Sequence, residues 1–203
     1  EIMPSLVGSE MCIRDSTGSI QYGGREMAGM TDAERCGVVG YLGHDPELLS
    51  DSIRNNILLG RDDDAWKYLR AVCLEDEVKA MPNGLDTRVG DGGVRLSGGQ
   101  QQRLALARTL AHPRPLLVLD DPFSALDRKT EEQVFDNLRK MTAGSTVLLI
   151  SHRLYLFPQM DGVLWIQDGK AVCAAHKELM AQNPQYAALM NAQEGGEQDE
   201  PEK

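Results

Sequence analysis

The stretch Leu96-Ser97-Gly98-Gly99-Gln100-Gln101-Gln102-Arg103 decides how the chain is interpreted. A serine and two glycines stand here directly before a helical pattern in which Leu106 and Leu110 are one turn apart. Such a turn leaves backbone N–H groups, a hydroxyl and the positive end of a helix exposed. The stretch therefore predicts an anion-binding turn suited to a phosphate, although an isolated Ser-Gly-Gly would equally fit a loop with a serine helix cap.

Short apolar segments on both sides of this turn predict a sheet. Three have the length of buried strands: Cys36–Leu42, Leu116–Leu119 and Thr146–Ile150. Helical patterns over Ala65–Ala80 and Lys129–Met141 alternate with them, and Ser50 or Asp51 is expected to cap a further short helix. This alternation is typical of a parallel sheet covered by helices on both faces.

A short strand is expected near the start of the chain and a hairpin near its end. Gly18–Tyr22 followed by Gly23-Gly24 indicates a short strand that ends in a turn. Val163–Ile166 and Ala171–Cys173 indicate a hairpin. Ligands of parallel sheets bind at the carboxyl ends of the strands, where Asp120, Asp121 and His152 stand in this sequence.

Over its full length the Leu96–Arg103 stretch resembles the signature motif of ABC-transporter ATPases. Further segments resemble other motifs of that family, in the order in which the family has them. Thr87–Gly93 resembles the loop that precedes the signature in exporters, Leu116–Asp120 resembles the Walker B strand, and Ser124–Asp127 resembles the D-loop. Ile150–Arg153 resembles the segment with the switch histidine, and His176–Leu189 resembles the C-terminal helices of exporters. The resemblance implies an α/β, P-loop NTPase-like ABC ATPase domain. Its mainly parallel sheet would be flanked by helices, with a helical subdomain that carries the signature motif.

The resemblance also implies a division of the chain. Residues 16–175 are expected to form the ABC ATPase domain, without a Walker A loop and with the helical subdomain at about 50–112. Residues 176–193 would form the C-terminal helices, and residues 194–203 an acidic disordered tail. Residues 1–15 lack periodicity and resemble an adapter-derived peptide, so they are interpreted as foreign; the alternative is an ordinary flexible N-terminus.

Residue roles follow from the positions that match the family's motifs. In the nucleotide site, Asp120 would bind Mg²⁺ beside ATP, and Asp121 and His152 would be the catalytic residues. Further nucleotide-binding positions are Ser97, Gly98, Gly99, Gln100, His44 and Asp127. The signature residues would contact ATP bound to a second ABC ATPase domain, and Asp127 would link the two sites.

Three departures from the family's pattern bear on activity. No G-x-x-x-x-G-K-[ST] loop occurs in the 203 residues, so the chain alone is expected neither to bind nor to hydrolyse ATP appreciably. Asp121 stands where the family has Glu. Because Asp is one methylene shorter, its carboxylate lies about 1.5 Å short of the position that a Glu carboxylate would reach. His44 stands where the family has Gln. Together these two positions predict the degenerate half of a heterodimer, with a homodimer that tolerates Asp as the alternative.

The leading hypothesis is therefore an ATPase module of an ABC exporter at the cytoplasmic face of the cell membrane. A transmembrane domain, missing from these residues, would be its partner in the same protein. The alternatives are a nucleotide-gated interaction module that supplies only the signature motif in trans, and a soluble ABC ATPase in repair or translation, which the exporter-like segments disfavour.

Composition supports these expectations. The formal net charge of −10 argues against nucleic-acid binding, because a polyanion repels an acidic chain. The four cysteines, in no C-x-x-C pair, favour reduced thiols over a disulfide framework. No apolar run approaches the roughly 18 residues that a membrane span needs.

Overall fold

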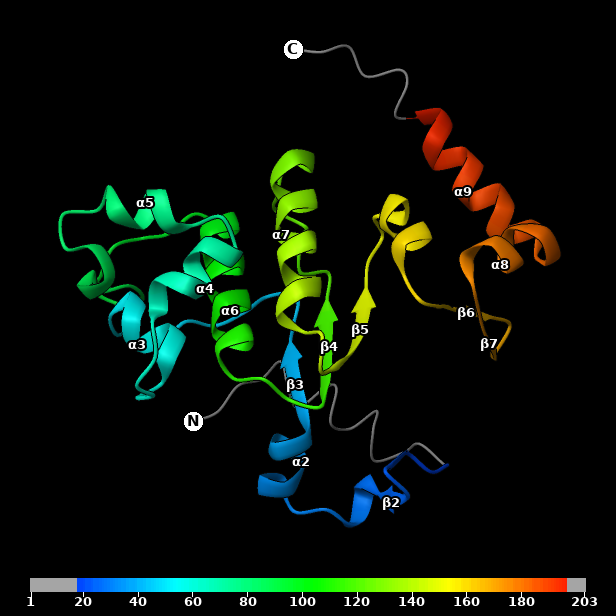
Figure 1. The fold of residues 1–203 in the computed structure, drawn as a ribbon, viewed down its shortest axis with the longest axis horizontal. Helices are drawn as coiled ribbons and strands as arrows, with labels where there is room; N and C mark the ends of the chain where they lie inside the picture. The colour runs from blue at the N-terminus through cyan, green and yellow to red at the C-terminus, as the bar shows by residue number, and fades with distance from the viewer. Residues whose placement is uncertain (1–17, 197–203) are drawn as a thin grey trace.

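A computed structural model describes residues 18–196 (Figure 1). The elements in chain order are β1 (Gln21–Tyr22), β2 (Arg25–Glu26), η1 (Met27–Gly29), α2 (Asp32–Val38), β3 (Val39–Leu42), α3 (Ile53–Leu58), α4 (Ala65–Ala71), α5 (Glu75–Lys79), η2 (Gly84–Asp86), α6 (Gly98–Ala111), β4 (Leu116–Asp120), α7 (Arg128–Met141), β5 (Thr146–Ile150), η3 (Leu154–Gln159), β6 (Val163–Gln167), β7 (Lys170–Ala174), α8 (His176–Gln182) and α9 (Pro184–Gly196).

A parallel sheet with the strand order β3-β4-β5 occupies the centre of the molecule (Figure 1). Leu42, Leu119 and Leu149 lie side by side in its register and join the same apolar core as the inward side chains of α6 and α7. Side chains alternate between the two faces of a strand, so the neighbouring positions point the other way. Within residues 18–196 that second face exposes large apolar groups, among them Tyr41 and Ile150.

The helices α3, α4 and α5 pack around α6 beside the sheet. Their shared core includes Ile57, Leu69 and Leu106, which are almost completely buried. Arg108 of α6 fixes the loop that follows β3, because its guanidinium donates hydrogen bonds to the Asn56 backbone oxygen (2.8 Å) and to the Glu47 oxygen (2.9 Å). The unit thus holds the loop after β3 against the helix that follows the Ser-Gly-Gly turn.

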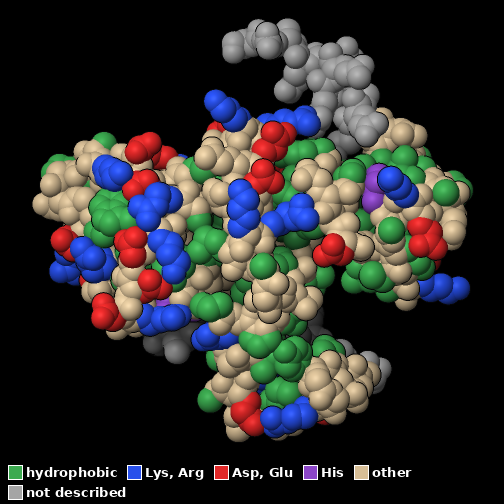
Figure 2. All heavy atoms as spheres, in the orientation of Figure 1, with side chains coloured by type: hydrophobic (Ala, Val, Ile, Leu, Met, Phe, Trp, Pro, Cys, Tyr) green, Lys and Arg blue, Asp and Glu red, His purple; other side chains and the backbone are tan. Residues whose placement is uncertain are grey.

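Charged side chains of both signs are interspersed over this helical unit on the face drawn in Figure 2. Several form ion pairs, such as Arg70 with Asp64 (3.2 Å) and with Glu75 (3.1 Å). These pairs lie at the surface, where solvent screens the charges, so they contribute little to stability. Apolar burial around α6 therefore holds the unit together.

The expected strand Cys36–Leu42 is wrong in its first half, which belongs to helix α2. The helix begins because Thr31 forms a capping box with Glu34. The Thr31 hydroxyl accepts from the Glu34 N–H (3.3 Å), and the Glu34 carboxylate accepts from the Thr31 N–H (2.8 Å). The sequence signal of this capping box is Thr-x-x-Glu, which stands at residues 31–34. The strand begins only at Val39.

Three further boundaries need correction. The helical stretch Ala65–Ala80 is broken into α4 and α5 at Cys73, whose φ of 54° lies in the left-handed region. Ser52, one residue later than expected, caps α3 by accepting from the Asn55 N–H (3.1 Å). Helix α7 begins at Arg128, with Asp127 as its N-cap, which gives Asp127 a structural role in addition to the expected one.

The predicted C-terminal hairpin is confirmed, whereas the predicted strand Gly18–Tyr22 is shorter than expected and forms a hairpin of its own. The strands β1 and β2 pair antiparallel across Gly23 and Gly24, whose positive φ values of 56° and 77° suit glycine in a two-residue turn. The strands β6 and β7 form the second hairpin. It packs with α8 and α9 around the fully buried Tyr186, against which Trp165 stands edge-on at 5.5 Å between ring centroids. None of the helices in the described part of the chain is long and apolar enough to cross a membrane.

Candidate nucleotide site

Asp121 lies at the carboxyl end of β4, in an unusual backbone conformation. Its φ of 48° falls in the left-handed region, which few non-glycine residues adopt and which is often found at functional sites. The Asp121 N–H donates to the Ile150 oxygen at the end of β5 (2.8 Å). The strand ends therefore hold the Asp121 backbone in place while its side chain turns toward the loops.

Two histidines converge on the Asp121 carboxylate, and these three residues are termed the Asp121 site. The His152 Nδ1 atom lies 3.2 Å and the His44 Nδ1 atom 3.7 Å from the same Asp121 oxygen, Oδ2. The carboxylate is 14% exposed, whereas the two imidazoles are 64% and 57% exposed. A mostly buried carboxylate thus lies behind two imidazoles that reach solvent.

The second carboxylate oxygen, Oδ1 of Asp121, is buried and has no hydrogen-bond partner among the residues that the structure describes. A buried acceptor without a partner is costly, and it is therefore available to a hydrogen-bond donor that enters the site. A water molecule is the simplest such donor. The arrangement can hold and polarise a water molecule between a carboxylate and an imidazole.

Gln102 connects the Asp121 site to α6 and was not among the expected site residues. Its side-chain amide donates to the Asp121 backbone oxygen (3.4 Å), and the residue is 3% exposed. The sequence held a signal for it, because Gln102 lies one turn before Leu106 on the same apolar face of the helix. A polar side chain on a buried helix face needs a partner, and here the partner is the backbone of Asp121.

Asp120 is the last residue of β4 and lies beside Ile150 of β5. Within residues 18–196 no group of three or more His, Cys, Asp or Glu side chains is placed to hold a metal ion. Mg²⁺ typically takes one or two protein carboxylates and completes its shell with water and phosphate oxygens. A single carboxylate at the strand end fits that mode, so Asp120 would hold Mg²⁺ only together with a bound phosphate.

Ser97–Gln100, termed the signature turn, forms a complete capping box at the start of α6. The Ser97 hydroxyl accepts from the Gln100 N–H (3.2 Å), and the Gln100 side chain accepts from the Ser97 N–H (2.8 Å). The Gln100 amide also donates to Glu77 of α5 (2.7 Å). These bonds fix the exposed turn at the positive end of a 14-residue helix.

The two glycines of the signature turn differ in their surroundings. A Cβ atom added to Gly99 would lie 2.9 Å from the Ala125 backbone oxygen, whereas one added to Gly98 would meet nothing within 4 Å. Gly99 therefore allows close approach of the loop that ends at Asp127. Asp127 itself accepts from the Thr130 N–H (3.0 Å), and hydrogen bonds from Thr130 lower the pKa of its carboxyl.

The expected site residues thus fall into two groups. His44 and His152 both contact Asp121, and Asp120 precedes Asp121 in the chain. The hydrogen bonds of Ser97 and Gln100 lie within the first turn of α6 and extend to Glu77, and Gly99 adjoins the Ala125 loop. Gln102 links the two groups through the Asp121 backbone.

A pocket of about 390 Å³ opens beside His44. The loop after β3 forms one wall, and α6 forms the other with Ala105, Arg108 and Thr109. His44 belongs to both the pocket wall and the Asp121 site. His44 is therefore the residue that joins the pocket wall to the Asp121 site.

The fold and the site are those of a nucleotide-binding domain of the ATPase class. They combine a parallel sheet, an acidic pair at one strand end, a histidine at the next strand end and a capped Ser-Gly-Gly turn. The sequence profile of the family described as ABC transporter matches residues 5–124. The chain belongs to the ABC transporter family and is an ATP-binding domain of the exporter type.

Relatives of known name agree with this assignment. The ATP-dependent lipid A-core flippase of Paraburkholderia xenovorans (strain LB400) is 42% identical over 159 residues, which cover 76% of this chain and 27% of that protein. The glutathione/L-cysteine transport system ATP-binding/permease protein CydD of Bacillus subtilis (strain 168) is 34% identical over 91% of this chain and 33% of that protein. The chain therefore spans about a quarter to a third of these relatives.

A solved structure gives the same result. A bacterial Atm1-family ABC exporter with ATP bound superposes with a TM-score of 0.81 and 30% sequence identity, covering 94% of this chain and 36% of the other. The predicted fold class, an α/β ABC ATPase domain with a parallel sheet flanked by helices, is confirmed.

Proposed function

We propose that this chain is the ATPase part of an ABC exporter, in which ATP binding and hydrolysis between two ATPase domains drive a transmembrane domain of the same longer protein. The observation that carries the proposal is the Asp121 site, with His152 Nδ1 3.2 Å from the Asp121 carboxylate at the strand ends. The similarity to exporters supports a position at the cytoplasmic face of the cell membrane.

In this proposal the residues of the Asp121 site act on a water molecule. The Asp121 carboxylate accepts a hydrogen bond from the attacking water, and His152 donates to the terminal phosphate and orients it. Asp120 holds Mg²⁺, which when bound neutralises charge on the phosphate oxygens. The exposed N–H groups of the signature turn bind the terminal phosphate of ATP held by the second domain.

The proposed dimer is a heterodimer in which this chain provides the weaker site. Asp121 is one methylene shorter than the glutamate of the family pattern, and a misplacement on the order of 1 Å can cost about 10²-fold in rate. His44 replaces a longer, more flexible glutamine beside it. The signature turn, in contrast, has its full set of hydrogen bonds. The alternative is a homodimer that hydrolyses ATP slowly at both sites.

The pocket beside His44 fits this scheme as a contact surface for the transmembrane domain. It is lined by the same loop that bears His44, so a segment seated there would sense the state of the Asp121 site. The large apolar groups on the second sheet face are consistent with further protein that packs against these residues in the longer relatives.

A second candidate function is a nucleotide-gated interaction module that supplies only the signature turn in trans. Asp121 and His44, the two positions that differ from the family pattern, favour it. The two candidates differ in whether the Asp121 site turns over ATP once a phosphate-binding loop is supplied.

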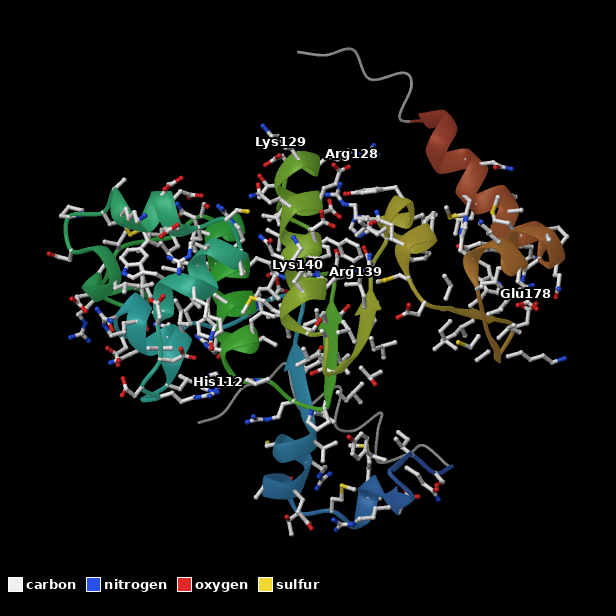
Figure 3. The ribbon with its side chains drawn as sticks, in the orientation of Figure 1. His112, Arg128, Lys129, Arg139, Lys140 and Glu178 are labelled. Atoms are coloured by element: carbon white, nitrogen blue, oxygen red, sulfur yellow. The ribbon has the colours of Figure 1, made fainter. Side chains whose placement is uncertain are left out.

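The test is a chimera in which the phosphate-binding strand and helix of an ABC exporter are joined ahead of Gly18. The proposal expects the folded chimera to hydrolyse Mg-ATP and expects His152→Ala to abolish turnover. Glu178→Gln on α8, an exposed position remote in sequence from the site residues, is the matched control and should keep the parent rate (Figure 3). A chimera that binds ATP but shows no His152-dependent hydrolysis would support the interaction module instead.

A further inference from the structure

A buried charged group lies on α7 near the loop that carries His152. Glu131 is fully buried, and one of its carboxylate oxygens lies 3.8 Å from the Arg153 guanidinium. Neither carboxylate oxygen has a hydrogen-bond partner among the residues that the structure describes, and the same holds for Arg153 Nε and the Tyr155 hydroxyl. Glu131, Arg153 and Tyr155, of which only Glu131 is fully buried, are termed the Glu131 triad.

The electrostatics of the triad reach the nucleotide site. Burial raises the pKa of Glu131, and the negative charge of Asp121 acts in the same direction, whereas Tyr155, Arg153 and His152 act to lower it. Burial and the neighbouring Glu131 carboxylate raise the pKa of Tyr155. The charges of Asp121 and His152 therefore act on the Glu131 carboxyl.

Stability does not account for the triad. The desolvation of a buried ion pair costs about as much as the pairing returns, and apolar residues of similar size often stabilise a fold equally well. An ion pair does fix the orientation of the arginine side chain, because the guanidinium must point toward the carboxylate. Since Arg153 directly follows His152 in the chain, the direction of Arg153 constrains the backbone on which His152 stands.

A second contact ties the same loop to the start of α7. The Arg128 guanidinium lies over the Tyr155 ring, 4.4 Å from its centroid, and Figure 3 shows Arg128 in the first turn of that helix. Asp127 is the N-cap of this turn, and its backbone oxygen accepts from the Glu131 N–H (2.9 Å). The loop that bears His152 is therefore attached at two points to the helix that begins at Asp127.

We propose that Glu131 is a positioning residue of the nucleotide site: its buried carboxylate holds Arg153, and thereby holds His152 against Asp121. This inference rests on the proposed function, because it assigns His152 a role at the phosphate. It adds that His152 and helix α7 move together. The N-cap of that helix, Asp127, would face the second ATPase domain.

The experiment is a long-range ¹H–¹⁵N spectrum of the histidine imidazoles in the full 203-residue chain. The chain has four histidines, so substituting each by Gln assigns every ring. Glu131→Gln keeps the shape of the side chain but removes the negative charge that pairs with Arg153. Glu132→Gln, one residue along and exposed on the same helix, is the matched control.

The expected result is a change of the His152 ring signals in Glu131→Gln, with His112 and His176 unchanged and with no change in Glu132→Gln. Should Glu131→Gln not fold, the double variant Glu131→Gln, Arg153→Gln leaves no unpaired buried charge, and it is expected to shift the same signals. Unchanged His152 signals in a folded variant that has merely lost stability would overturn the proposal. The spectra are recorded without nucleotide, so this outcome is independent of whether the protein hydrolyses ATP.

Discussion

The signature turn and the Asp121 site are built in opposite ways. The signature turn obtains its main hydrogen bonds within four residues, through the mutual capping of Ser97 and Gln100. The Asp121 site is assembled from three distant segments, one each after β3, β4 and β5. A locally encoded turn survives when surrounding parts change, whereas a site of long-range contacts depends on side-chain length at every position.

The largest expected effect comes from the length of the residue at 121. In the chimera that carries a phosphate-binding loop, Asp121→Glu should raise the hydrolysis rate by about 10²-fold, because the carboxylate reaches the attacking water. Steady-state phosphate release measures this, with Asp121→Asn as the variant that should lose the remaining activity. An unchanged rate in Asp121→Glu would show that side-chain length does not limit this site.

The two glycines of the signature turn provide a matched pair. Gly99→Ala should destabilise the chain by about 1–3 kcal/mol, because the added Cβ meets the Ala125 oxygen. Gly98→Ala, in open space, should be neutral or stabilise by up to about 1 kcal/mol through its higher helix propensity. Denaturant unfolding of both variants measures the difference, and equal stabilities would contradict the close contact between Gly99 and the Ala125 loop.

The cap of α6 can be compared with the cap of α3. Ser97→Ala and Ser52→Ala each remove a hydroxyl that accepts from a helix N–H, so each should lower the free energy of unfolding by about 1 kcal/mol. Only Ser97→Ala should also weaken the trans contact to nucleotide. The measurement is nucleotide-dependent dimer formation with a second ATPase domain. Equal dimer formation by the two variants would contradict a special role of the signature turn.

The smallest effect concerns the pH dependence of stability around Glu131. Its pKa in the folded chain is raised above the unfolded value, so the unfolded state releases the proton first as pH rises. The contribution of Glu131 is therefore most favourable below about pH 4.5 and is lost as pH rises through the folded pKa. Glu131→Gln should remove this loss, which is seen by comparing unfolding free energies of variant and parent from pH 4 to 7. Parallel curves would contradict the raised pKa.

The sequence predicted the elements that local patterns specify. The helix after Ser97, the strands at Leu116 and Thr146 and the C-terminal hairpin are confirmed, because caps, glycine turns and apolar runs act over a few residues. The boundary at Cys36 was wrong although the capping box of Thr31 stood in the sequence. The break at Cys73 could not be predicted, since a non-glycine residue adopts a left-handed φ only where its surroundings impose it.

The candidate site divides in the same way. The positions of His44, Asp121 and His152 followed from motif resemblance, but their convergence on one carboxylate oxygen depends on how three strand ends align. Gln102 could have been found from its place on the apolar face of α6. The burial of Glu131 could not, because the sequence pattern of α7 gives no sign that Arg153 and Tyr155 pack against it.

We predict that these 203 residues, although they present the signature turn and the Asp121 site, do not hold ATP without a phosphate-binding loop. A calorimetric titration of the 203-residue chain with Mg-ATP tests it most directly. The account predicts no saturable binding at micromolar ATP. Micromolar affinity of the chain alone would contradict it and would require another phosphate-binding segment within these residues.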